Sequence, residues 1–156
     1  MSDIVIIGGG IAGISAAARL APHAEVIVLE AEKQLAYHAS GRSAAAFIED
    51  YGNSVVRALN VASVEYLRSA NGGVLGPRGM MMIGKERERQ DFLVDMKDFG
   101  LMEISIAEAK QKVPLINQNL VKYAAYREDV SDIDTDLFIQ NFQRTARSHG
   151  TNFQTD

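Results

Sequence analysis

Cysteine and tryptophan are absent from the 156-residue chain, and histidine occurs only three times. Without cysteine the chain can form neither a disulfide nor a thiolate metal site. His23, His38 and His149 lie far apart in the sequence, so no two of them have the short spacing that is typical of metal-binding pairs. The composition therefore argues against a zinc or two-metal enzyme.

Neither sign of charge is in large excess, since 16 basic and 20 acidic residues leave a net charge of -4. This balance gives no reason to expect nucleic acid or an anionic membrane as a partner. Residues 4–18 carry no charge, but four glycines interrupt this run. It is also shorter than the roughly 20 apolar residues that span a bilayer, and no lysine or arginine precedes it as in a signal peptide. We expect no transmembrane segment and a cytoplasmic protein.

The first thirty residues have the pattern of a nucleotide-binding β-α-β unit. A β-branched run at residues 3–7 predicts a strand buried on both faces of a parallel sheet. It leads directly into residues 8–13, which form a complete G-x-G-x-x-G motif. An alanine-rich helix is expected over residues 11–20, and a second buried strand over residues 25–30. The order strand, glycine loop, helix, strand is the context that this motif requires.

Each glycine of the motif has a steric role. Gly8 permits the tight turn from strand to helix, Gly10 lets a pyrophosphate approach the backbone, and Gly13 lets the helix pack closely on the strand. Glu30 ends the second strand, close to the expected separation of about 20 residues from the motif. A carboxylate there can accept hydrogen bonds from ribose hydroxyls and would repel the 2′-phosphate of NADP. The unit predicts a site for the ADP half of a dinucleotide but does not separate FAD from NAD.

A second segment, residues 37–46 (Tyr-His-Ala-Ser-Gly-Arg-Ser-Ala-Ala-Ala), favours FAD. It resembles the flavin-contacting segment of the glycine oxidase / D-amino-acid oxidase superfamily of FAD-dependent amine oxidoreductases. Within that superfamily it is most similar to the D-arginine dehydrogenase-like group. The resemblance continues at residues 51–52, 56–59, 62–63 and 131–136. It implies FAD as the cofactor and an α/β fold, in which a Rossmann-like β-α-β unit with a parallel sheet is joined to part of an α+β substrate lobe.

The cofactor contacts that the motif and the resemblance imply lie in three stretches of the sequence. The glycine of the second segment frees the backbone to turn, its arginine and serine supply donors, and a helix is expected to begin at residues 44–46. Without the resemblance, His38 would be interpreted as a capping or packing residue, and Arg42 as a solvated surface cation. The predicted cofactor-binding residues are Gly8, Gly10, Ile11, Ala12, Gly13, Glu30, Ala31, His38, Ser40, Gly41, Arg42, Ser43, Ala44 and Ala45.

Two positions depart from the members that act on basic substrates. Ala46 stands where those members carry a histidine, and Met80 stands where they place a glutamate facing the cationic side chain. An apolar thioether cannot pair with a guanidinium, and an unpaired buried cation would be costly. The expected substrate is therefore a small or apolar amine or amino acid. An alternative remains open, in which residues 80–82 are simply a strand whose alternate side chains enter the core.

The resemblance implies a reaction in which a C–N bond is oxidised by hydride transfer to the flavin, giving an imine that water hydrolyses. Tyr51 corresponds to a tyrosine on a mobile loop that covers the substrate, with Gly52 as a hinge. A tyrosine that merely packs at a helix start is the other possibility. No residue is assigned as an acid or base, because a neutral amine needs none.

The predicted domain organisation follows the resemblance. Residues 1–74 would belong to the FAD-binding domain, residues 75–132 to a partial substrate lobe, and residues 133–156 to a truncated return to the FAD-binding domain. Full-length members are more than twice as long, so we expect exposed apolar surface, open sheet edges with possible self-association, and no activity of the chain alone. A non-catalytic dinucleotide-binding module and an NAD-linked dehydrogenase fragment remain as alternative functions.

Overall fold

The computed structural model describes residues 2–156 and divides into two compact units. Unit 1 comprises the residues up to Ala45 together with Arg68–Val74 and Ile133–Asp156, and unit 2 comprises Ala46–Leu67 and Leu75–Asp132. Within residues 2–156, no helix combines the length and the apolar character that crossing a bilayer requires.

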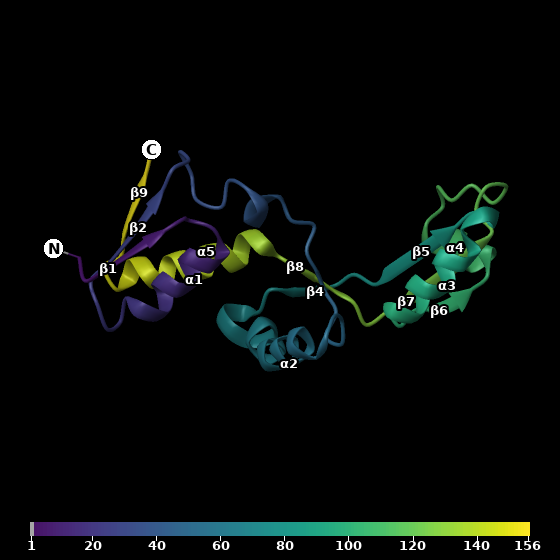
Figure 1. Cartoon of the computed structure of the whole chain (residues 1–156), viewed down its shortest axis with the longest axis horizontal. Helices are drawn as coiled ribbons and strands as arrows, with labels where there is room; N and C mark the ends of the chain where they lie inside the picture. Colours follow the sequence, from purple (N-terminus) through teal and green to yellow (C-terminus); the bar gives the residue numbers. More distant parts are fainter. Residues whose placement is uncertain (1) are drawn as a thin grey trace. The chain divides into compact units, whose positions relative to one another are not determined.

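Unit 1 is built on a three-stranded parallel sheet in the order β1-β2-β9 (Figure 1). Its strands are β1 (Ile4–Ile7), β2 (Val26–Glu30) and β9 (Asn152–Thr155). Helix α1 (Ile11–Leu20) connects β1 to β2, and α5 (Thr135–Ser148) leads into β9. The two helices pack side by side on one face of the sheet. This is the α/β, Rossmann-like arrangement that the sequence pattern predicts.

Only one face of the unit 1 sheet is covered, so the prediction of a β1 buried on both faces is wrong. Val26 and Val28 of β2 point toward the helices and are buried. On the opposite face, Val5 is 56% exposed and Ile7 is 88% exposed. Because side chains alternate along a strand, a continuous apolar run does not reveal whether a second layer of the chain covers its other face.

Unit 2 contains two small sheets, in the orders β3-β8-β4 and β5-β7-β6. The strands that form them are β3 (Ala46–Phe47), β4 (Leu75–Pro77), β5 (Met80–Gly84), β6 (Met102–Ile104), β7 (Tyr123–Arg127) and β8 (Ser131–Ile133). The helices are α2 (Ser54–Ser69), whose last residues belong to unit 1, α3 (Arg89–Asp98) and α4 (Ile106–Lys112). Among the described residues, 3-10 turns lie at Ala39–Arg42 and Ala70–Gly72 in unit 1 and at Glu86–Glu88 in unit 2.

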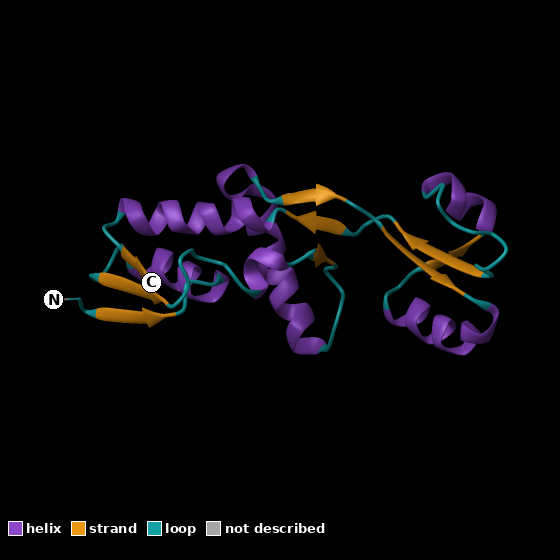
Figure 2. Cartoon of the chain, turned by 90° about the horizontal axis from the view of Figure 1, so that it is seen from above, coloured by secondary structure: helices purple, strands orange, loops and turns teal. Residues whose placement is uncertain are grey.

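Helices α3 and α4 cover opposite faces of the β5-β7-β6 sheet (Figure 2). Phe92 of α3 packs near Ala125, whereas Ala109 of α4 packs near Ala124, the neighbouring residue of β7. The methionine run of β5 contributes to both layers, with Met81 on the α4 side. Residues 80–82 therefore form a strand whose side chains enter two cores, as the alternative interpretation of this run predicts.

The helix expected to begin at residues 44–46 is not formed. The chain makes a 3-10 turn over Ala39–Arg42 and then becomes extended, and Ala46–Phe47 pairs with β8 in antiparallel fashion. The N–H of Ile133 donates to the carbonyl of Ala45 at 3.1 Å. The alanines favour a helix by propensity, but pairing with a strand distant in sequence takes their backbone groups instead.

We predict that Gly13→Ala destabilises unit 1. The added Cβ would lie 2.0 Å from the carbonyl oxygen of Gly8, a backbone atom that has little room to move. Overpacking of this kind costs about 1–3 kcal/mol or more, so we expect urea denaturation to show a loss of at least about 2 kcal/mol.

Gly76→Ala is the matched control, because nothing lies within 4 Å of a Cβ built at Gly76. Its free energy of unfolding should change by less than about 0.5 kcal/mol. Equal losses in the two variants would show that the contact between Gly13 and Gly8 does not limit packing.

Candidate functional site

The N-terminus of α1 leaves backbone donors without partners in the helix. Its N-cap, Gly10, is extended and has no side chain that could cap the helix. The first intrahelical hydrogen bond runs from the N–H of Ile14 to the carbonyl of Gly10 at 3.0 Å. The N–H groups of Ala12 and Gly13 precede that bond and have no partner within the helix. These donors and the positive end of the helix dipole suit a phosphate group.

Ser40 lies at the same helix end, although it is distant in sequence. Its hydroxyl oxygen accepts a hydrogen bond from the N–H of Ile11 at 3.0 Å. A Cβ built at Gly10 would lie 3.2 Å from this oxygen, so the glycine keeps the approach open. A hydroxyl that accepts one hydrogen bond can still donate its own hydrogen to a phosphate oxygen. The predicted residues Ile11 and Ser40 are therefore adjacent.

Glu30 folds back over the glycine loop. Its Oε2 accepts from the N–H of Gly9 at 2.7 Å, and its Oε1 accepts from the N–H of Glu32 at 2.9 Å. The hydrogen bonds from Glu32 and Gly9 hold the pKa of Glu30 below its ordinary value. The carboxylate is therefore ionised at neutral pH, and each oxygen keeps a lone pair that can accept a hydrogen bond from a ribose hydroxyl.

His38 and Arg42 make local contacts on the surface of unit 1. Nε2 of His38 lies 2.7 Å from Oε1 of Glu32. Nε of Arg42 donates to the carbonyl of Tyr37 at 2.9 Å, and its guanidinium carbon lies 4.9 Å from the centroid of the Tyr37 ring. Both arrangements agree with the local roles that these residues would have if taken alone. The remaining donors of Arg42 stay available for a ligand.

The other residues of the predicted cofactor set lie beside this turn. Gly41 is required sterically, because a Cβ there would lie 2.2 Å from the carbonyl oxygen of Ala36. Ala31 and Ala44 are exposed, and Ala45 is half-buried. Their side chains are small, so any contact with a cofactor would come from their backbone.

A hollow of about 310 Å³ lies within unit 1 at the start of α1. It joins Ile11, Ser40 and Ser43 of the predicted set to an apolar wall that includes Phe138 of α5. The full lining is Ile11, Ala39, Ser40, Ser43, Ile133, Thr135, Phe138 and Ile139. The sequence alone did not indicate that α5 lines this hollow. The apolar periodicity of a helix predicts that one face is buried, but it does not predict which segment that face packs against.

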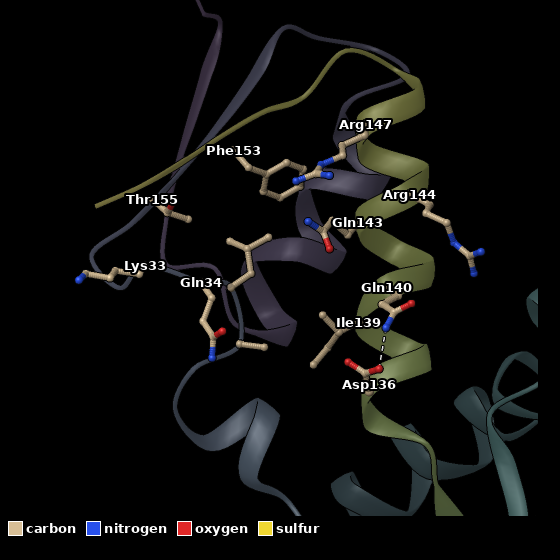
Figure 3. A pocket seen from close by; sticks show the side chains of 12 residues that line it. Lys33, Gln34, Asp136, Ile139, Gln140, Gln143, Arg144, Arg147, Phe153 and Thr155 are labelled. Atoms are coloured by element: carbon tan, nitrogen blue, oxygen red, sulfur yellow. Dashed lines mark hydrogen bonds between the residues drawn. The ribbon is translucent and has the colours of Figure 1, made fainter.

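A second hollow, of about 580 Å³, lies between residues 33–36 and α5 (Figure 3). Asp136 and Gln140 form a hydrogen bond of 2.6 Å on its wall, and the guanidinium of Arg147 lies over the ring of Phe153. Arg144 points away from the hollow. Among the described residues that line it, none belongs to the predicted cofactor set. The hollow nevertheless lies close to the glycine loop, because the N–H of Ala36 on its wall donates to the carbonyl of Gly9 at 2.9 Å.

A third cavity, of about 320 Å³, lies within unit 2. All three residues predicted on the substrate side, Ala46, Tyr51 and Met80, line it. The ring of Tyr51 stacks on that of Phe99, with centroids 5.3 Å apart and planes at 7°. The remaining lining residues are Phe47, Ile48, Val56 and Asn60. None of the lining residues that the structure describes carries a charge at neutral pH, so the cavity suits an apolar group.

A metal ion has no evident site in this part of the chain. Within residues 2–156, no group of three or more histidine, cysteine, aspartate or glutamate side chains is placed to hold one.

The chain matches a family model described as "DAO: FAD dependent oxidoreductase" over residues 3–156. Its fold is similar to that of dithionite-reduced L-α-glycerophosphate oxidase from Mycoplasma pneumoniae with FAD bound, at 17% identity and a TM-score of 0.76. It is also similar to that of L-proline dehydrogenase from P. horikoshii, at 22% identity and a TM-score of 0.72, and to that of glycine oxidase from Geobacillus kaustophilus, at 20% identity and a TM-score of 0.74.

These three matches cover 99% of this chain but only 44%, 44% and 46% of the respective solved chains. The chain therefore spans less than half the length of each solved protein.

We predict that Glu30 makes the stability of the protein depend on pH. A group whose pKa is lowered by folding stabilises the protein fully above its unfolded pKa, and this stabilisation is lost as the pH falls through its folded pKa. We therefore expect Glu30→Gln to be less stable than the wild type at pH 7. The difference should close as the pH falls below the ordinary pKa of 4.5.

Urea denaturation of both proteins over a series of pH values measures this difference. Glu25→Gln, at the exposed residue just before β2, is the control and should leave the free energy of unfolding at pH 7 nearly unchanged. A difference between Glu30→Gln and the wild type that persists unchanged at about pH 2 would contradict the assignment.

Proposed function

We propose that this chain, which belongs to the DAO family of FAD-dependent oxidoreductases, holds the ADP end of FAD at the start of α1. We also propose that it takes part in oxidising the C–N bond of an apolar amine or amino acid. FAD is the cofactor of the family. The observation that carries the proposal is that the glycine loop, Ser40 and ionised Glu30 all lie around the same helix end.

The residues present fit the pyrophosphate and adenosine of FAD. The N–H groups of Ala12 and Gly13 would donate to the pyrophosphate, and the Ser40 hydroxyl would donate beside them. The two oxygens of Glu30 would accept from the ribose hydroxyls. The same negative charge disfavours a 2′-phosphate.

The unit 2 cavity supports an apolar substrate. When bound, FAD would accept a hydride, which carries both electrons, from the carbon next to nitrogen; the nitrogen would lose a proton, leaving an imine for water to hydrolyse. The role of this chain's residues would be to bind and orient the substrate carbon and to exclude water. Met80 and Ala46 offer no partner for a guanidinium or a phosphate, so a substrate with a cationic or phosphorylated side chain would lose the hydration of that group without compensation.

A dinucleotide-binding module without catalysis remains an alternative function. Membership of the D-arginine dehydrogenase-like group and a cytoplasmic location remain predictions.

We predict that the purified chain binds FAD and that Glu30→Gln weakens binding about tenfold, because one charged acceptor for the ribose is lost. Titration with FAD, followed by flavin fluorescence, measures both affinities, and Glu25→Gln should bind like the wild type. Tight binding of NAD with no response to FAD would sink the cofactor assignment.

We predict that Met80→Glu changes the substrate preference toward a cationic side chain. In the longer enzyme to which this chain would belong, anaerobic mixing of the FAD-loaded protein with leucine and arginine, in both stereoisomers, should bleach the flavin with leucine when Met80 is unchanged. In the variant, arginine should gain at least about tenfold relative to leucine, since a buried ion pair replaces an unpaired cation.

Ile83→Glu is the control for this change. It places a carboxylate on the same strand at a side chain that is exposed and does not line the cavity, so the preference should not change. Bleaching of the wild type by arginine alone would overturn the apolar assignment. Bleaching by no amine or amino acid would favour the non-catalytic module.

A further inference from the structure

Arg127, at the end of β7, is a nearly buried cation held by two carboxylates. Its side chain is only 13% exposed. Nε and one terminal nitrogen donate to the two oxygens of Asp129, at 2.5 and 2.9 Å. The hydrogen bonds with Asp129 raise the pKa of Arg127, and those with Arg127 lower the pKa of Asp129, so both groups stay charged. This bidentate pair fixes the plane of the guanidinium.

The other terminal nitrogen of Arg127 joins two segments of the cavity wall. It donates to Oδ1 of Asp50 at 2.8 Å and to the carbonyl oxygen of Phe99 at 3.1 Å. Tyr51 is the next residue after Asp50, and its ring stacks on the ring of Phe99. This one nitrogen of Arg127 thus connects the backbone of Phe99 to Asp50, the residue before Tyr51.

The segment that carries Tyr51 needs such an anchor. Tyr51 is 48% exposed, and it lies just before α2 next to Gly52, whose φ of +91° marks a sharp turn. Beside it, the amide of Asn60 donates to the carbonyl of Ile48 at 3.2 Å. A hydrogen bond to an ionised partner is roughly twice as strong as such a neutral one. The segment has two such charge-assisted bonds, from Arg127 to Asp50 and from Nε of Arg57 to the carbonyl of Gly52 at 2.8 Å. Of these two cations, Arg127 is the one that also bonds Phe99.

We propose that Arg127 is a positioning residue that holds Tyr51 against Phe99 and so keeps one wall of the unit 2 cavity in place. Arg127 does not itself line the cavity. Its importance for a substrate rests on the proposed function, whereas its effect on the two rings does not. Preorganisation of a wall improves affinity, because binding no longer has to order it.

A purely structural role would give a different pattern. If Arg127 only needed its charge balanced, the loss of either carboxylate would change the Tyr51 ring and the cavity to the same extent. The two carboxylates offer a matched comparison, since the side chains of Asp50 and Asp129 are both largely exposed, at 63% and 73%. Only Asp50 lies on the segment of Tyr51, so Asp50→Ala cuts the link and Asp129→Ala leaves it intact.

The experiment compares Asp50→Ala, Asp129→Ala and Arg127→Met with the wild type in the full 156-residue chain. Its first readout is the NMR shift of the Tyr51 ring, identified by its loss in Tyr51→Phe, which stacking on Phe99 displaces upfield. The second is the affinity for 3-methylbutylamine, followed at the methyl group of Met80. We expect Asp50→Ala and Arg127→Met to lose the upfield shift and to bind the amine about tenfold more weakly.

We expect Asp129→Ala to keep both properties and Asp50→Asn, which retains an acceptor oxygen, to restore most of the shift. Equal losses in Asp50→Ala and Asp129→Ala would overturn the proposal, as would an unchanged Tyr51 shift in Asp50→Ala. If the amine fails to perturb Met80 in the wild type, the proposed substrate cavity is wrong. The ring shifts then still decide the role of Arg127.

Discussion

The close approach of α1 to the turn that follows β1 is the contact on which the candidate cofactor site depends. Gly13 lies against the carbonyl of Gly8, at a separation that no side chain would permit. This contact sets the start of the helix directly beyond the end of the strand. The free N–H groups of the first turn, the loop and the end of the neighbouring strand are then presented together. A side chain at Gly13 would push the helix away and disperse these donors.

Two polar residues from later in the chain complete that helix end in different ways. Ser40 supplies a hydroxyl beside the first N–H of α1, and Glu30 supplies a carboxylate that the N–H of Gly9 keeps ionised. The site thus has donors for a phosphate next to acceptors for a sugar. This order of groups matches the ADP half of FAD, the cofactor of the family to which the chain belongs.

The unit 2 cavity has a different character from the cofactor site. Its wall is apolar and aromatic, and the charges lie outside it, where Arg127 joins the segment of Tyr51 to Phe99. The charge of Arg127 therefore positions the cavity wall and does not contact the inside of the cavity. Such a division suits a substrate without a charged side chain, because no buried cation or anion is left unpaired.

The sequence by itself determined the β-α-β unit, the glycine motif and the bounds of the helix between its strands, because glycine sterics and apolar periodicity act locally. It misjudged the outer face of β1 and the backbone at residues 44–46, since covering layers and strand pairing come from distant segments. Only the tertiary structure decided that Ser40 meets Ile11, that Phe138 lines the hollow beside them, and that Arg127 bonds both Asp50 and Phe99. These contacts join residues far apart in sequence, and no local rule specifies them.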